Sequence, residues 1–172
     1  GAVLFSRAIA GGREGPHIAS ALTRTMLAVM VVGAVPLWLL APTLVEVVYG
    51  PPFAAAGTAL QILLPGVLAY SVVVALANPI IAWGAPGRLT AVLVTGLILN
   101  LVANVLLIQQ LGMNGAALAS TISYFATAIL VVSLYRALSG QSVGETLIIR
   151  RSDARHVWSE LSRRSRRSQG EA

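Results

Sequence analysis

Long uncharged stretches of apolar residues fill the middle of this chain. From Thr25 to Arg136 only three residues carry a charge: Glu46, Arg88 and Arg136. A helix needs about 20 consecutive apolar residues to cross the hydrocarbon core of a bilayer. The first uncharged stretch is long enough for one crossing, and each of the other two is long enough for two. This pattern predicts helices that span a membrane.

Glycine and proline divide these stretches at three points. Tyr49–Phe53 reads YGPPF, Gly84–Arg88 reads GAPGR and Gly112–Gly115 reads GMNG, and each combination favours a turn over a continued helix. The sequence therefore predicts an all-α membrane protein with a loop at 46–58. Its four complete transmembrane helices are expected near residues 25–45, 60–83, 90–110 and 115–136.

The composition excludes several classes of protein. Of the 172 residues, 56% are hydrophobic and 10% are charged, whereas a soluble domain has about 25% charged residues. Cysteine is absent, and the two histidines lie outside the apolar stretches, so no metal site or cofactor is expected. The spans contain no pair of acidic and basic groups suited to proton transfer, and the only aspartate is Asp153. An enzyme is therefore not expected.

The basic residues, all of them arginine, indicate the orientation of the chain. Four spans place both chain ends and the 84–88 turn on one side of the membrane, and all twelve arginines fall on that side. Arginine-rich loops remain in the cytoplasm. The sequence thus predicts a multi-pass protein of the inner, cytoplasmic membrane, with its basic loops and tail in the cytoplasm. It gives no reason to expect a nucleic-acid partner.

The chain divides into three parts. Residues 1–24 are expected to hold the end of a truncated fifth span and a cytoplasmic loop, residues 25–136 the four-helix region, and residues 137–172 an arginine-rich tail. Residues 150–167 of the tail place apolar and basic residues on opposite helical faces. The tail is either an interfacial helix on anionic membrane lipid or a solvated segment that only enforces topology.

Polar residues inside the spans are the candidates for a substrate pathway, because each is costly in lipid unless it faces protein or water. Asn100 and Asn104 lie four residues apart, on one helical face. They either line a cavity or form hydrogen bonds between helices. Ser71 and Asn78 share a face of the 60–83 span. Arg24, at a span end, either reaches the cavity mouth or only marks topology.

Two prolines lie inside predicted spans. Proline has no N–H group, so Pro65 leaves the carbonyl of Gln61 without its helical donor, and Pro36 does the same to Val32. Each proline is a candidate hinge or a static kink. Gln61 is a further candidate for the substrate pathway.

Small residues recur every four positions on the last span. Gly115, Ala119, Ser123 and Thr127 form one stripe, which is typical of a face on which another helix packs closely. A structural role is therefore expected for this stripe.

Four segments together resemble a known family. They are Leu44–Phe53 (LVEVVYGPPF), Ala59–Leu63 (ALQIL), Asn100–Asn104 (NLVAN) and Gly112–Ser120 (GMNGAALAS). In order and spacing they resemble polysaccharide-type flippases of the multidrug/oligosaccharidyl-lipid/polysaccharide exporter superfamily. The resemblance implies a fold of two six-helix lobes around a central cavity. Residues 1–140 would close the second lobe.

The same resemblance implies a function. Such proteins move lipid-linked polysaccharide or oligosaccharide intermediates across the cytoplasmic membrane by alternating access. The expected partners are a lipid-linked glycan and the missing N-terminal helices of the same protein. A multidrug exporter of the same superfamily is the first alternative, although such exporters use a buried carboxylate that these spans lack. A membrane protein with a structural role only is the second.

Overall fold

The computed structural model describes the backbone of residues 15–140 and the side chains of residues 27–140. This part consists of α2 (Gly15–Tyr49), a short 3₁₀ turn η1 (Pro51–Phe53), α3 (Ala54–Ala82), α4 (Pro86–Leu111) and α5 (Met113–Ser139). It contains no strand. Four of its helices are long and apolar enough to cross a membrane. The all-α, four-helix membrane architecture predicted from the sequence is confirmed.

Two predicted segments fall outside the described residues. They are the end of the truncated span, within residues 1–14, and the possible interfacial helix, within residues 141–172.

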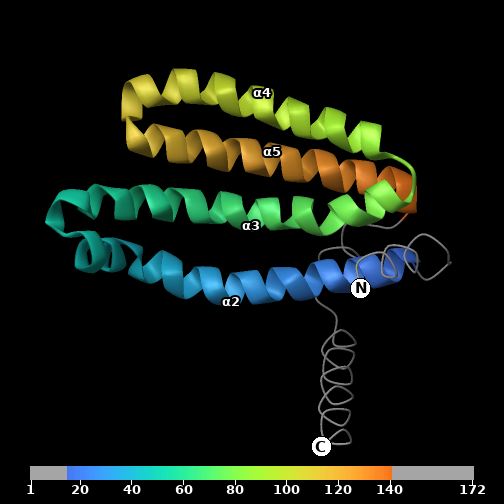
Figure 1. Cartoon of the computed structure of the whole chain (residues 1–172), viewed down its shortest axis with the longest axis horizontal. Coiled ribbons are helices and arrows are strands. Elements are labelled where there is room, and N and C mark those ends of the chain that lie inside the picture. Colours follow the sequence, from blue (N-terminus) through green and yellow to red (C-terminus); the bar gives the residue numbers. More distant parts are fainter. Residues whose placement is uncertain (1–14, 141–172) are drawn as a thin grey trace, which may run out of the picture.

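The four helices lie side by side in one layer, in the order α2–α3–α5–α4 (Figure 1). Helix α5 packs between α3 and α4, although α4 precedes it in the chain. Because successive helices are antiparallel, α5 runs in the same direction as α3. The inner helices α3 and α5 therefore have neighbours on two sides, whereas α2 and α4 form the edges of the layer.

The helices extend beyond the predicted spans. Helix α2 includes residues 15–24 and continues through Glu46 to Tyr49, while α3 begins at Ala54. The predicted loop at 46–58 is therefore wrong, since only Gly50 and η1 separate the two helices. Helix α5 likewise continues to Ser139, into the part of the chain that was expected to begin the tail. Hydropathy indicates only the part of a helix that lies in lipid. The helical backbone hydrogen bonds continue beyond that part, so each helix is longer than its predicted span.

One glycine makes the whole turn between α4 and α5. Gly112 ends α4 and begins α5, with φ +56° and ψ −129°, a combination that side chains with a Cβ rarely adopt. Its N–H group donates to the carbonyl of Ile108 at 2.9 Å. This turn holds α4 and α5 together as a tight hairpin.

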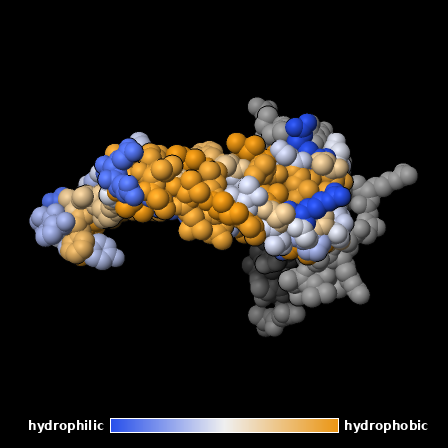
Figure 2. All heavy atoms as spheres, turned by 90° about the horizontal axis from the view of Figure 1, so that it is seen from above, coloured by the Kyte–Doolittle hydropathy of each residue, from blue (hydrophilic) through white to orange (hydrophobic). Residues whose placement is uncertain are grey.

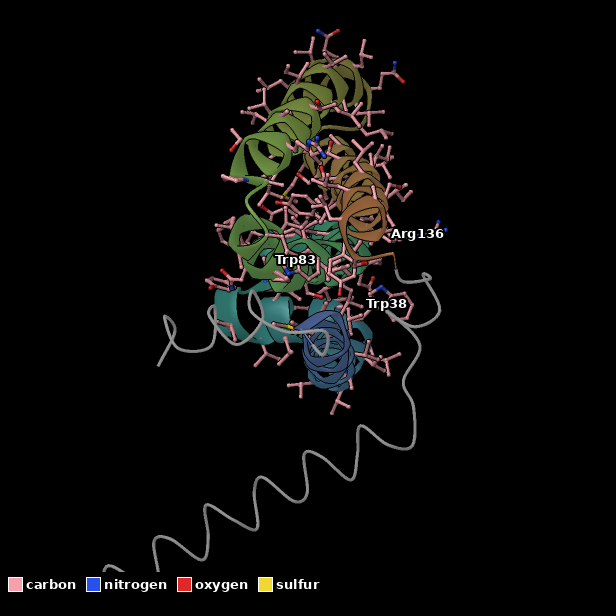
Figure 3. The ribbon with its side chains drawn as sticks, turned by 90° about the vertical axis from the view of Figure 1, so that its right-hand side faces the viewer. Trp38, Trp83 and Arg136 are labelled. Atoms are coloured by element: carbon pink, nitrogen blue, oxygen red, sulfur yellow. The ribbon has the colours of Figure 1, made fainter. Side chains whose placement is uncertain are left out.

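The apolar core lies toward the end of the layer that holds the Ala82–Pro86 turn. Buried residues of α3, α4 and α5 meet there, with Tyr135 fully buried. The rings of Tyr135 and Trp83 lie 5.3 Å apart between their centroids, and Trp83 points inward at this end (Figure 3). The core consists of Val72, Val73, Leu76, Ile80, Ala85, Leu89, Ala128, Val131, Val132 and Tyr135.

The outer surface of the layer is apolar over its middle part. Figure 2 shows this apolar surface, with hydrophilic side chains gathered toward the two ends of the layer. On the edge helices, Val47 is 78% exposed and Val105 is 63% exposed. Contiguous apolar surface of this extent marks contact with lipid or with other apolar helices. The described part is thus that of a multi-pass membrane protein.

Candidate functional site

A belt of side-chain hydrogen bonds crosses the layer from one edge to the other. It comprises six residues, called the polar belt here: Trp38, Gln61, Asn100, Asn104, Ser120 and Thr121. Each lies about 12–18 Å along its helix from Gly50 or Gly112, at 1.5 Å per residue. With these turns at the membrane surface, that depth falls inside a hydrocarbon core of about 30 Å, where hydrogen-bonding groups need partners.

Helices α2 and α3 are joined by two reciprocal hydrogen bonds. The indole Nε1 of Trp38 donates to the carbonyl of Gln61 at 3.0 Å, and Nε2 of Gln61 donates to the carbonyl of Trp38 at 2.9 Å. Pro42 and Pro65 lie four residues after Trp38 and Gln61, so neither carbonyl has its usual helical donor. Each side chain thus satisfies the carbonyl that a proline on the other helix leaves free. We call this pair of bonds the proline clasp.

A hydroxyl and a glycine join α3 to α5. The hydroxyl of Thr121 donates to the carbonyl of Ile62 at 2.6 Å. One turn further along α3, a Cβ on Gly66 would lie 2.6 Å from the Cα of Thr121. Glycine at this position therefore allows the two backbones to approach closely enough for the hydrogen bond.

Asn104 bonds to Asn100 within α4, and Asn100 alone of the two asparagines reaches α5. Nδ2 of Asn104 donates to the carbonyl and to Oδ1 of Asn100, at 2.9 and 3.0 Å. Nδ2 of Asn100 in turn approaches the hydroxyl of Ser120 at 3.4 Å, which is long for a hydrogen bond. Both asparagines are half-buried. Among the described residues no donor reaches Oδ1 of Asn104, so this oxygen can still accept a hydrogen bond.

The other pathway candidates lie apart from the asparagines. Ser71 and Asn78 are on α3, and α5 separates that helix from α4. The hydroxyl of Ser71 donates to Leu68 of its own helix at 2.6 Å, and Asn78 is exposed one turn before α3 ends. Arg24 falls on α2, but its side chain lies outside the described part.

The candidate hinges differ in their surroundings. The carbonyl that Pro65 frees accepts a hydrogen bond from Nε1 of Trp38 in the proline clasp, so α3 is bonded to α2 at this proline. Pro36 is exposed on α2, at the edge of the layer.

The small-residue stripe of α5 is buried along its whole length. A Cβ on Gly115 would clash with the backbone of Leu107 on α4, and one on Gly96 of α4 would clash with the side chain of Thr127. The hydroxyls of Ser123 and Thr127 donate to carbonyls of their own helix, each at 2.7 Å. The stripe thus presents small residues, with satisfied hydroxyls, where α4 approaches α5.

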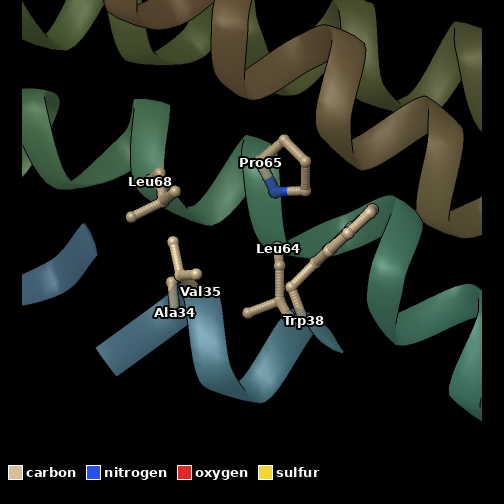
Figure 4. Close-up of a pocket in the computed structure, with 6 residues that line it drawn as sticks. All are labelled: Ala34, Val35, Trp38, Leu64, Pro65 and Leu68. Atoms are coloured by element: carbon tan, nitrogen blue, oxygen red, sulfur yellow. The ribbon is translucent and has the colours of Figure 1, made fainter. Parts of the chain in front are cut away.

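Two grooves open on the surface of the described layer. One, of about 260 Å³, lies between α2 and α3, where Ala34, Val35 and Trp38 face Leu64, Pro65 and Leu68 (Figure 4). The other, of about 430 Å³, lies between α3 and α5 and ends at Arg136. Neither groove is lined by Asn100 or Asn104. In the described layer the two amides face the α4–α5 contact and not an enclosed cavity.

Four residues of this arrangement were not among the candidates predicted from the sequence: Trp38, Pro42, Ser120 and Thr121. The sequence could have indicated Trp38 and Pro42, because they have the same four-residue spacing as Gln61 and Pro65. The hydroxyls of Ser120 and Thr121 gave no comparable signal, because serine and threonine are common where helices pack in membranes.

The polar belt offers hydrogen-bond donors and acceptors but no group suited to proton transfer. Glu46, the only acid whose side chain is described, is exposed near the end of α2. Within the described residues no three His, Cys, Asp or Glu side chains come close enough to hold a metal ion. No protein-family profile, curated protein or solved structure matches the chain.

Proposed function

We propose that this chain forms a helical layer of a flippase, which moves lipid-linked polysaccharide or oligosaccharide intermediates across the cytoplasmic membrane by alternating access. The observation that carries the proposal is the Asn100–Asn104 pair. The two amides lie within the hydrocarbon core, on a helix whose other exposed residues near them are apolar. They also belong to one of the four segments that resemble the flippase family.

The position of the pair at the edge of the layer supports this proposal. Helix α4 is the outermost helix, and only Leu89 and Gly96 of it are buried. Polar groups on such a helix are costly unless they meet protein or water. Oδ1 of Asn104, still able to accept a hydrogen bond, suits a hydroxyl-rich or hydrated substrate that passes along this edge.

The charges favour this function over an ion-coupled drug exporter. Coupling to ions generally requires an ionisable group inside the membrane. In the part whose side chains are described, Glu46, Arg88 and Arg136 are the charged residues, and all three lie in the last or first turns of their helices. The orientation that we propose places Arg88 and Arg136 on the cytoplasmic side.

Replacing Asn100 and Asn104 together by leucine tests the proposal. Leucine has a similar volume, so α4 and α5 should remain packed. The double variant should lower glycan export about tenfold, on the order of one or two lost hydrogen bonds. Export is measured as accumulation of lipid-linked glycan in cells that carry the variant in place of their own copy. The melting temperature of the purified protein is measured in parallel.

Thr90 and Thr95 provide the matched control. Both are exposed on α4, and their hydroxyls donate to carbonyls of the same helix at 3.0 and 2.9 Å. Changing both to valine removes two polar groups from α4 without touching the asparagines, and it should leave export unchanged. Normal export by the leucine variant would overturn the pathway role of the asparagines. A loss of export that follows a loss of melting temperature would assign them to helix packing.

A further inference from the structure

The groove between α3 and α5 has mainly apolar walls and one positively charged side chain. Its volume is about 430 Å³, and its walls include Ala69 and Val72 of α3 and Phe125, Ile129 and Val132 of α5. Arg136 lines its end, in the last turn of α5. The groove between α2 and α3, by contrast, is lined only by apolar side chains. Of these two grooves, the α3–α5 groove is the one with apolar walls along its length and a positive charge at its end.

The length of the α3–α5 groove matches one leaflet of a bilayer. From Phe125 to Arg136 helix α5 rises about 16 Å, at 1.5 Å per residue. Half of a hydrocarbon core of about 30 Å is about 15 Å. When Arg136 lies at the level of the lipid headgroups, Phe125 lies near the middle of the membrane. An acyl chain of that leaflet then runs along the groove.

Arg136 lacks an acidic partner in the part of the chain that the structure describes. The one acid there, Glu46, lies at the opposite end of the layer, where α2 ends. Arg136 is exposed, and Figure 3 shows it reaching outward from α5, whereas Trp83 lies inside the layer. A guanidinium group at headgroup level pairs well with a phosphate, because its planar fork donates two parallel hydrogen bonds.

We propose that the α3–α5 groove binds one anionic phospholipid from the leaflet on the Arg136 side, with an acyl chain along Val72, Phe125 and Ile129 and the phosphate at Arg136. The complementary charge at the end of the groove selects an anionic lipid over a zwitterionic one. This lipid is a bound component of the protein and is distinct from any transported glycan, so the proposal does not depend on the proposed function.

Native mass spectrometry of the full chain tests this proposal. The protein is released from nanodiscs that contain equal amounts of phosphatidylglycerol and phosphatidylcholine, and the lipids that remain bound are counted. We expect wild type to retain phosphatidylglycerol preferentially. Arg136→Gln should weaken this retention about fivefold, because the variant loses the arginine that contacts the lipid phosphate in the groove. Arg88→Gln is the matched control, since Arg88 is exposed at the same end of the layer but does not line the groove.

A second variant tests the apolar part of the groove. Ser133 lines the groove, is exposed, and donates its hydroxyl to Ile129 of its own helix at 2.8 Å. Ser133→Phe should fill the groove without removing charge or disturbing the core, and it should lower retention of phosphatidylglycerol. If Arg136→Gln and Arg88→Gln lowered phosphatidylglycerol retention equally, the lipid would be attracted by surface charge in general, and the proposed site would be wrong. Undiminished retention in Ser133→Phe would equally overturn it. Melting temperatures in phosphatidylcholine alone confirm that each variant is folded.

Discussion

Replacing Gly66 by alanine is expected to lower the free energy of unfolding by about 1–3 kcal/mol, although it adds a single methyl group. The new Cβ would lie 2.6 Å from the Cα of Thr121, and a backbone atom cannot move aside as a side-chain end can. Helices α3 and α5, the two inner helices, would have to separate. Their separation would also lengthen the hydrogen bond from Thr121 to Ile62, which is 2.6 Å long.

Gly33→Ala is the matched control for this prediction. Gly33 also lies inside a helix, but a Cβ there would meet no atom within 4 Å. The same chemical change should therefore leave stability unchanged or raise it by about 0.5–1 kcal/mol, through the better helix propensity of alanine. Unfolding of both variants in mixed detergent micelles gives the comparison. If Gly66→Ala were as stable as Gly33→Ala, the close approach of α3 and α5 would be wrong.

Gln61→Leu is expected to destabilise the contact between α2 and α3 by about 1–3 kcal/mol, the cost of a backbone carbonyl left without a partner in a membrane. The variant removes the donor to the carbonyl of Trp38, which has no helical donor because Pro42 lies four residues later. The effect should therefore depend on that proline. In a Pro42→Ala background the new N–H group can bond the Trp38 carbonyl, and the cost of Gln61→Leu should shrink by about 1 kcal/mol.

Pro36 supplies the control for this double-mutant cycle. It lies on the same helix, but the carbonyl that it frees belongs to Val32 and not to Trp38. In a Pro36→Ala background Gln61→Leu should therefore retain its full cost. Free energies of unfolding for the single and double variants give the two coupling energies. Equal coupling to both prolines would contradict the proline clasp.

The sequence predicted the number and place of the helices because those depend on length and hydropathy alone. An uncharged apolar stretch of sufficient length has few alternatives in a membrane. The turns at Gly50, Gly84 and Gly112 were also readable, since glycine and proline mark them. The predicted loop at 46–58 was too long, because hydropathy does not report where backbone hydrogen bonding ends.

The partners of the polar residues could not be predicted in the same way. Whether Gln61 meets Trp38 depends on α2 lying beside α3, and whether Asn100 meets Ser120 depends on α5 lying beside α4. Membrane helices are apolar on all sides, so their periodicity does not indicate which face meets which neighbour. Gln61 was expected on a substrate pathway, whereas the structure shows its side chain bonded to α2.

Accessibility of single cysteines shows whether four helices cross the membrane with the arginine-bearing end in the cytoplasm. The chain has no cysteine of its own, so each introduced thiol reports alone. Ala55, Met113 and Gly87 are exposed positions, the first two at one end of the layer and Gly87 at the other. In intact cells an impermeant thiol reagent should label Ala55→Cys and Met113→Cys, but should label Gly87→Cys only after the cells are opened. Labelling of Gly87→Cys in intact cells, or equal labelling at all three positions, would contradict the account.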